Sequence, residues 1–120
     1  MGKFTFRKEE RLNKELWIKE LFERGSSFHL YPFKVLRLPH PQPGWPCTQV
    51  LISVPNRNFK LAVDRNKLKR RIREAYRLYK AMLGDEQKWL IAYIYTAKEL
   101  NDSKLIHERV QQTLTRITKK

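Results

Sequence analysis

A dense run of basic residues, Arg65–Arg77, constrains this chain more than any other feature of its sequence. The run reads RNKLKRRIREAYR, and residues 57–80 contain ten Lys or Arg and two acidic residues, which gives +8 of the chain's net charge of +14. Like charges on adjacent helical turns repel one another unless a partner neutralises them. The run therefore predicts that the folded chain binds a polyanion.

The same run has the periodicity of an amphipathic helix. At about 100° per residue, its apolar and basic residues fill two neighbouring arcs. We expect Asp64 to be the N-cap and Gly84 the C′ residue. A solvated face or a localisation signal would also be basic, but those alternatives suit shorter runs without an apolar stripe. The apolar arc contains Leu68, Ile72, Ala75, Tyr76, Tyr79 and Leu83, and the basic arc contains Asn66, Lys69, Arg70, Arg73, Arg77 and Lys80.

Composition limits the class of protein. A chain of 120 residues is expected to form one domain, residues 1–120, and its pI of about 10.2 is typical of nucleic-acid binders. It contains neither an apolar run long enough to span a membrane nor a signal-peptide stretch near its start. Its single cysteine, Cys47, allows no intrachain disulfide. We therefore expect a cytoplasmic protein; a membrane-surface role would require the helix's apolar stripe to contact lipid instead of the core.

Two further helices are expected. Residues 9–24 read as a first helix that Gly25 ends. Its apolar residues lie on more than one side, so this helix either lies deep in the core or offers a second surface to a partner. Residues 103–117 read as the last helix, with Asn101, Asp102 or Ser103 as its cap.

The remaining segments are β-prone. In residues 28–38, Pro32 cannot donate to a ladder, which leaves two short strands or an irregular edge strand. A proline-rich loop, 39–48, precedes an alternating strand at 49–54. The continuous apolar run 89–95 predicts a central strand covered on both faces. The order is α-β-β-(β)-α-β-α, which indicates an α+β fold with a small sheet backed by helices.

Catalytic chemistry is not evident in the sequence. His29, His40 and His107 do not have metal-ligand spacing with one another or with Cys47. Asp85 and the following Glu are better explained as a solvated turn, and no glycine-rich phosphate loop or nucleophile elbow occurs. We expect no catalytic residue and no metal site on the chain itself.

Residues 50–76 combine an apolar strand ending in Ser-Val, a basic turn and the sequence AVDRNKLKRRIRE. They resemble the protein subunit of bacterial ribonuclease P, a family with the pattern Ala-Val-x-Arg-Asn-Arg-[Ile/Leu]-Lys-Arg-x-[Ile/Leu]-Arg-[Glu/Asp]. Arg11-Leu12 and residues 21–25 resemble that family's first helix and its end. Three positions depart from the family: Lys67 replaces its second Arg, Phe59-Lys60 lengthens the basic turn, and Ile18 replaces a common aromatic residue.

The resemblance implies a fold and a division of labour. The fold is a two-layer α/β sandwich like the second domain of a small-subunit ribosomal protein, with a left-handed βαβ crossover that opposes the usual right-handed preference. The catalyst is an RNA subunit with Mg²⁺, and one protein per RNA subunit binds that RNA and the 5′ leader of precursor tRNA. Residues expected at the RNA subunit are Arg65, Asn66, Lys67, Lys69, Arg70, Arg73 and Arg77, and those expected in the leader cleft are Phe22, Phe33, Tyr31, Arg57 and Lys60.

Two other functions use the same basic helix. One is a general or ribosome-associated RNA-binding protein that binds RNA without processing it. The other is a DNA-binding protein that reads the major groove, although beyond Asn66 the basic face has few short polar residues for base edges. We expect the ribonuclease P role, which a processing assay with the RNA subunit distinguishes from both.

Overall fold

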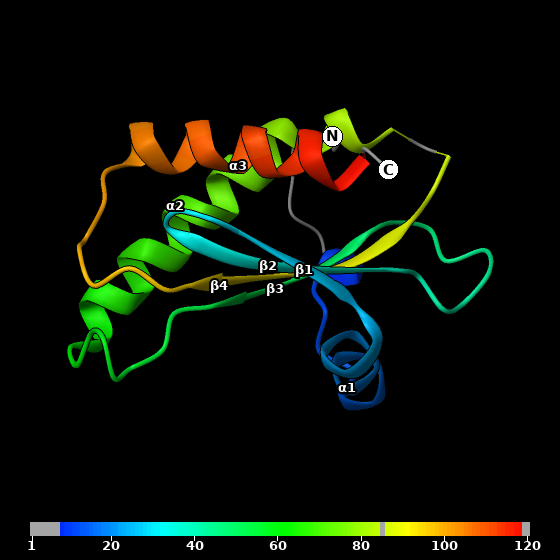
Figure 1. Ribbon diagram of the computed structural model, residues 1–120, viewed down its shortest axis with the longest axis horizontal. Coiled ribbons are helices and arrows are strands. Elements are labelled where there is room, and N and C mark those ends of the chain that lie inside the picture. The colour runs from blue at the N-terminus through cyan, green and yellow to red at the C-terminus, as the bar shows by residue number, and fades with distance from the viewer. Residues whose placement is uncertain (1–7, 85, 119–120) are drawn as a thin grey trace.

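The computed structural model describes residues 8–84 and 86–118 (Figure 1). These residues form a four-stranded sheet with helices on both of its faces. The α2 and α3 helices cover one face of the sheet, and α1 crosses the other face. The α+β prediction is thus confirmed. In chain order the elements are η1 (Lys8–Glu10), α1 (Glu15–Arg24), β1 (Ser26–Leu30), β2 (Phe33–Pro39), β3 (Gln49–Ser53), α2 (Ala62–Tyr79), η2 (Lys80–Leu83), β4 (Trp89–Tyr95) and α3 (Ser103–Thr118).

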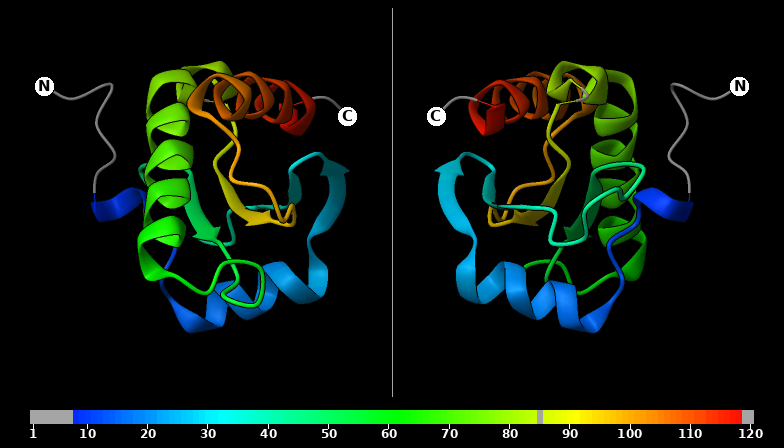
Figure 2. Two further views of the ribbon diagram at one scale, coloured as in Figure 1. Left: turned by 90° about the vertical axis from the view of Figure 1, so that its left-hand side faces the viewer. Right: turned by 90° about the vertical axis from the view of Figure 1, so that its right-hand side faces the viewer.

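The strand order is β1-β2-β4-β3, with β3 parallel to β4 and the other neighbours antiparallel. The connection from β3 through α2 to β4 is a left-handed crossover on the face that α3 also covers (Figure 2). Because β4 lies between β2 and β3 and helices pack on both of its faces, a continuous apolar run is the composition it needs.

Strand alternation divides the interior into two apolar clusters. Ile91, Tyr93 and Tyr95 of β4 point toward α2 and α3, whereas Leu90 and Ala92 point toward α1. Complete burial raises the pKa of the Tyr93 phenol, and its hydroxyl lies 2.7 Å from the hydroxyl of Thr113. Apolar packing on both faces of the sheet therefore fixes the position of α2 relative to the ends of the strands.

The predicted first helix begins later than expected. Its helical hydrogen bonding begins at Glu15, and the Leu12 N–H donates to the Val50 carbonyl at 3.0 Å instead. Leu12 is buried by this pairing with the edge strand β3, a tertiary interaction that helical periodicity does not report. The helix does end at Gly25, where a β-carbon would collide with the carbonyl of Leu21.

The other element boundaries follow the sequence with one exception. Residues 26–39 form two strands, which confirms the first alternative for that segment. Gly84 ends the α2–η2 segment at φ 74°, and Asp102 Oδ1 caps α3 by accepting from the Leu105 N–H at 3.0 Å. The N-cap of α2 is Leu61, so the Asp64 prediction was wrong; Asp64 lies in the first turn, where its charge favours the helix dipole.

Candidate nucleic-acid interface

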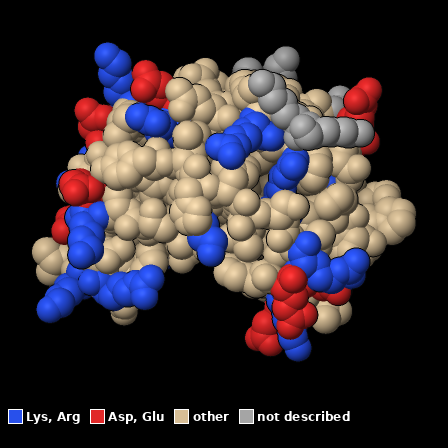
Figure 3. All heavy atoms as spheres, viewed as in Figure 1, with Lys and Arg blue, Asp and Glu red and all other residues tan. Residues whose placement is uncertain are grey.

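The basic face of α2 points away from the sheet. Leu68, Ile72, Ala75 and Tyr76 are buried, and this stripe fixes the rotation of the helix about its axis. Lys and Arg side chains gather where α2 begins and along the loop before it (Figure 3). Asn66, Lys67, Arg70 and Arg73 are exposed, and Lys69 and Arg77 are half-buried.

Most of these cations are available to a partner. Among the residues that the structure describes, Lys67, Lys69, Arg70 and Arg73 make no ion pair or side-chain hydrogen bond. Guanidinium and ammonium groups of this kind form short, charge-assisted hydrogen bonds with phosphate oxygens. The outer side of α2 is therefore suited to a polyanionic backbone.

Two predicted RNA ligands also have partners within the protein. The Arg65 guanidinium donates to the carbonyls of Phe59 and Lys60 at 2.6 and 3.0 Å, and so supports the basic turn from within. Arg77 Nη2 lies 2.5 Å from Glu74, and this hydrogen bond lowers the pKa of the Glu74 carboxyl. Both arginines therefore stabilise the local structure of this surface and also contribute positive charge to it.

Lys80 does not belong to the basic surface. Its ammonium donates to both carboxylate oxygens of Glu10 at 2.9 and 2.6 Å, and its side chain is 15% exposed. Its place in the predicted basic arc was wrong because η1, far away in sequence, lies against the end of α2 and supplies the counter-charge. Arg71, on the other flank of α2, likewise donates to the carbonyl of Asn101 at 2.5 Å.

A hollow of about 460 Å³ lies where β3 and β4 end. Exposed Arg57 and Lys98 supply positive charge, and half-buried Ile94 supplies apolar surface, whereas Tyr95 is fully buried at the base of the hollow. Cations beside apolar surface suit single-stranded nucleic acid, because its bases can pack on the apolar groups while its phosphates meet the charges. The complete lining is Pro55, Arg57, Asn58, Ile94, Tyr95, Thr96 and Lys98.

The α1 helix presents an exposed ring toward the same end of the sheet. Trp17 points the other way, because its ring contacts those of His40 and Trp45 at 4.7 and 5.1 Å, near the start of β4. Phe22 is five residues farther along, which places it about 140° around the helix from Trp17. Phe22 is 49% exposed, and Ile18, one turn before it, is half-buried against the sheet. Thus α1 supplies one exposed ring here, and Ile18 supplies apolar support.

Phe33 does not line this surface, so its assignment to the leader cleft was wrong. It is 1% exposed and makes edge-on contacts with Tyr93 and Tyr95 at 5.3 and 6.0 Å, between the sheet and α2. Strand parity is the reason, because Phe33 and Val35 point toward α2 and α3. Lys34 therefore points toward the α1 face and is half-exposed there. Lys34 lies two residues before Leu36, which packs beneath α1. The alternation of side chains along a strand therefore predicts that Lys34 is on the α1 face.

The remaining cleft candidates lie on the surface with different degrees of restraint. Tyr31 is 49% exposed, and its hydroxyl donates to Glu99 at 2.8 Å. The Thr96 N–H donates to the carbonyl of Pro32 at 2.9 Å, which places the β1–β2 turn beside the hollow. Lys60 is exposed, and the Arg65 bond to its carbonyl fixes its backbone.

Among residues 8–84 and 86–118, no group of three or more His, Cys, Asp or Glu is close enough together to hold a metal ion. The described helices include none with the length and apolarity that a membrane crossing requires.

Comparison with known proteins gives one family. The model of the family described as ribonuclease P matches residues 6–118. The ribonuclease P protein component of Porphyromonas gingivalis is 34% identical over 119 residues, which cover 95% of this chain and 87% of that one. The solved ribonuclease P protein of Thermotoga maritima superposes with a TM-score of 0.72 at 25% identity, over 89% of this chain and 96% of that one. A Staphylococcus aureus ribonuclease P protein mutant, described as defective in mRNA degradation, gives a TM-score of 0.76 at 24% identity, covering 92% and 89%.

Proposed function

Because the chain belongs to the family of ribonuclease P protein components, which act in tRNA 5′ processing as part of an endoribonuclease, we propose specific tasks for its two surfaces. The outer face of α2 binds the catalytic RNA subunit. The hollow at the ends of β3 and β4, with the adjoining side of α1, holds the 5′ leader of precursor tRNA. We refer to this second region, including Phe22 and Lys34, as the leader groove.

The observation that carries the proposal is the row of unpaired cations on α2. Arg70 and Arg73 are exposed, point away from the core and have no acidic partner among the described residues. An exposed cation without an acidic partner contributes the most binding free energy to a phosphate contact, because it gives up no internal ion pair on binding. Binding through the RNA backbone also explains why base-reading side chains other than Asn66 are scarce on this face.

The leader groove supplies the complementary chemistry. Phe22 offers an exposed ring on which a base can stack, and Arg57, Lys98 and Lys34 can follow the phosphates. Nothing in the groove requires a particular base, so it would accept leaders of different sequence. The groove would distinguish precursor from mature tRNA because mature tRNA has no leader to place there.

In this proposal the bond is broken by the RNA subunit, with Mg²⁺ bound to that RNA and to the substrate. The chain's own residues bind, orient and screen the charge of two RNA molecules that would otherwise repel each other. Positive charge at both surfaces lowers that repulsion, so the requirement for Mg²⁺ should fall when the protein is present. We propose one protein per RNA subunit, acting in the cytoplasm.

The test compares two double variants that remove equal charge. Arg70→Ala/Arg73→Ala changes the proposed RNA face, whereas Lys19→Ala/Arg24→Ala removes two exposed cations of α1. Each protein is mixed with the cognate RNA subunit at low Mg²⁺, and 5′ processing of precursor tRNA is measured together with RNA-subunit affinity over a range of salt. The α2 variant should lose affinity, and each lost phosphate contact should lower the log–log salt slope by about 0.7 to 0.9.

The result also separates the rival functions. A general RNA-binding protein would bind the RNA subunit without raising the rate of 5′ processing. If the two double variants show equal affinity and equal salt slopes, the basic face of α2 is only a solvated surface and the proposal fails.

A further inference from the structure

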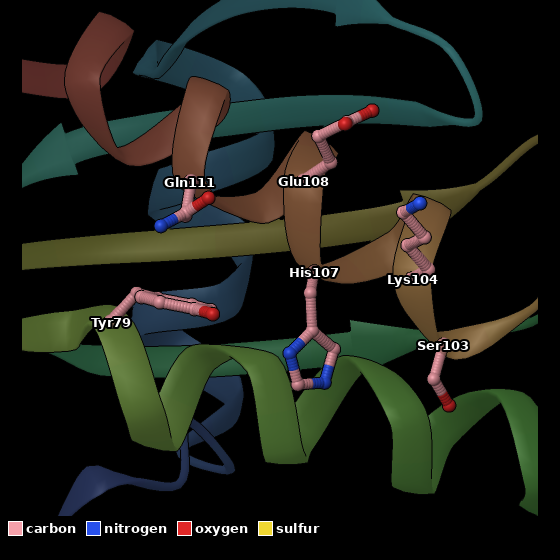
Figure 4. A pocket seen from close by; sticks show the side chains of 6 residues that line it. All are labelled: Tyr79, Ser103, Lys104, His107, Glu108 and Gln111. Carbon is pink, nitrogen blue, oxygen red and sulfur yellow. The ribbon is translucent and has the colours of Figure 1, made fainter.

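A second hollow, about 430 Å³ in volume, lies between α2 and the first half of α3 (Figure 4). Tyr79 extends from the end of α2 toward His107 of α3, and the two rings meet edge to face with centroids 5.8 Å apart. Ser103, His107 and Gln111 lie four residues apart, which places them along one side of α3 facing this space. The volume is within the range of pockets that hold small organic ligands.

The lining has the chemistry of a nucleotide site. Tyr79 and His107 are half-buried rings that leave part of their surface open to the hollow. The Gln111 amide can both donate and accept, the Glu108 carboxylate only accepts, and Lys104 supplies an exposed positive charge. A site for phosphate alone would not include an acceptor-only carboxylate, whereas a nucleobase with an exocyclic amino group can donate to one.

The hollow adjoins the basic face of α2. Arg77, at the edge of the basic face, bonds through its guanidinium to Glu74 at 2.5 Å. Glu74 in turn lies close to His107 of α3. On the other flank, Arg71 donates to the carbonyl of Asn101, just before α3 begins. An RNA strand along α2 therefore passes beside the mouth of the hollow.

From this geometry we infer that the hollow between Tyr79 and the Ser103–His107–Gln111 side of α3 receives one unpaired nucleotide of the RNA subunit. The inference rests on the proposed function of α2. The base lies against the two rings with its polar edge toward Gln111 and Glu108, and Lys104 meets its phosphate. Such a contact adds discrimination for a flipped-out base to a surface that otherwise binds the backbone.

The experiment exploits two adjacent glutamines of α3. Gln111 is half-buried and lines the hollow, whereas Gln112 is exposed and does not line it, so Gln111→Ala and Gln112→Ala are matched in chemistry and helix context. Each variant is bound to the full cognate RNA subunit, and the chemical reactivity of every unpaired base is mapped with and without protein. A photo-crosslinking residue placed at 111 or at 112 then identifies the nucleotide that lies there.

We expect wild-type protein and Gln112→Ala to protect the same base, and Gln111→Ala to leave it reactive with roughly fivefold weaker RNA binding. The crosslink from position 111 should fall on that base and the crosslink from 112 should not. Identical base reactivity for the two variants, with Arg70→Ala/Arg73→Ala still impaired in binding, would overturn this inference and leave the proposed function intact. If the Arg70/Arg73 variant also binds normally, the proposed function fails and this inference fails with it.

Discussion

The Lys80 ammonium lies 2.6 Å from a carboxylate oxygen of Glu10, and the two side chains are only 15% and 4% exposed. The pair joins η1 to the end of α2 across 70 residues of sequence. It thereby holds the segment before α1 against the end of the basic helix.

Removing one partner of this pair should destabilise the fold. We expect Lys80→Met to lower the free energy of unfolding by about 3 to 5 kcal/mol, because it leaves the Glu10 carboxylate buried without its cation. Urea unfolding measures the loss. Lys67→Met is the control, since Lys67 is exposed and should change stability by less than about 0.5 kcal/mol. Equal stability of the two variants would mean that water solvates Glu10 adequately.

Arg65 is expected to act on the basic turn as well as on RNA. Arg65→Ala removes the donor to the carbonyls of Phe59 and Lys60, so it should reduce the free energy of unfolding by about 1 to 3 kcal/mol and weaken RNA binding. Arg70→Ala should weaken RNA binding with no loss of stability, because its side chain is exposed and unpaired among the described residues. Thermal melting of both variants, measured beside RNA affinity, checks the distinction. A stable Arg65→Ala protein would show that the turn holds without this support.

Phe33 should behave as a core residue. Phe33→Ala is expected to lower the free energy of unfolding by about 3 to 5 kcal/mol, because it opens a cavity beside Tyr93 and Tyr95. Any fall in binding should then affect precursor and mature tRNA equally, in proportion to the folded protein lost. A selective loss of precursor binding by a fully folded variant would contradict this placement.

Phe22 should show the opposite behaviour. Phe22→Ala is expected to weaken holoenzyme binding of precursor tRNA by about 1 to 3 kcal/mol, the worth of one stacked base, and to leave mature tRNA binding unchanged. Leu16→Ala is a suitable control, since Leu16 is also exposed on α1, at 61%, but lies on a different side of that helix. Affinities of the four protein–tRNA pairs test the prediction. If both variants lose precursor binding equally, Phe22 has no special role.

His40 should make stability depend on pH. Burial lowers the pKa of its imidazole below 6.5, and the hydrogen bond with Gln49 opposes this shift only in part. The folded chain therefore binds a proton less readily than the unfolded chain, so the free energy of unfolding should fall as pH drops below about 6.5. His40→Phe keeps a ring against Trp17 and Trp45 but cannot titrate. Urea unfolding between pH 8 and pH 5 should show a shallower decline for the variant; parallel curves would exclude His40 as the source.

Local patterns in the chain were sufficient for much of the fold. The stripe containing Leu68 and Ile72 gave the orientation of α2, and the apolar run 89–95 gave a central strand, because both depend on periodicities of the backbone itself. Pro32 indicated the break between two strands for the same reason, since it has no N–H to donate. The left-handed crossover was available only through resemblance, because no local preference of the chain encodes it.

The sequence alone determined which residues carry positive charge and which side of α2 presents them, since both follow from residue type and a helical repeat. Tertiary structure decided which cations remain available: Lys80 is neutralised by Glu10, and Arg65 is held by the carbonyls of the turn before it. It also decided that Phe33 faces the core while Lys34 faces α1, because an alternating strand can present either face until a sheet and its helices assign one. These outcomes depend on contacts between segments far apart in the chain, whose pairing no local pattern specifies.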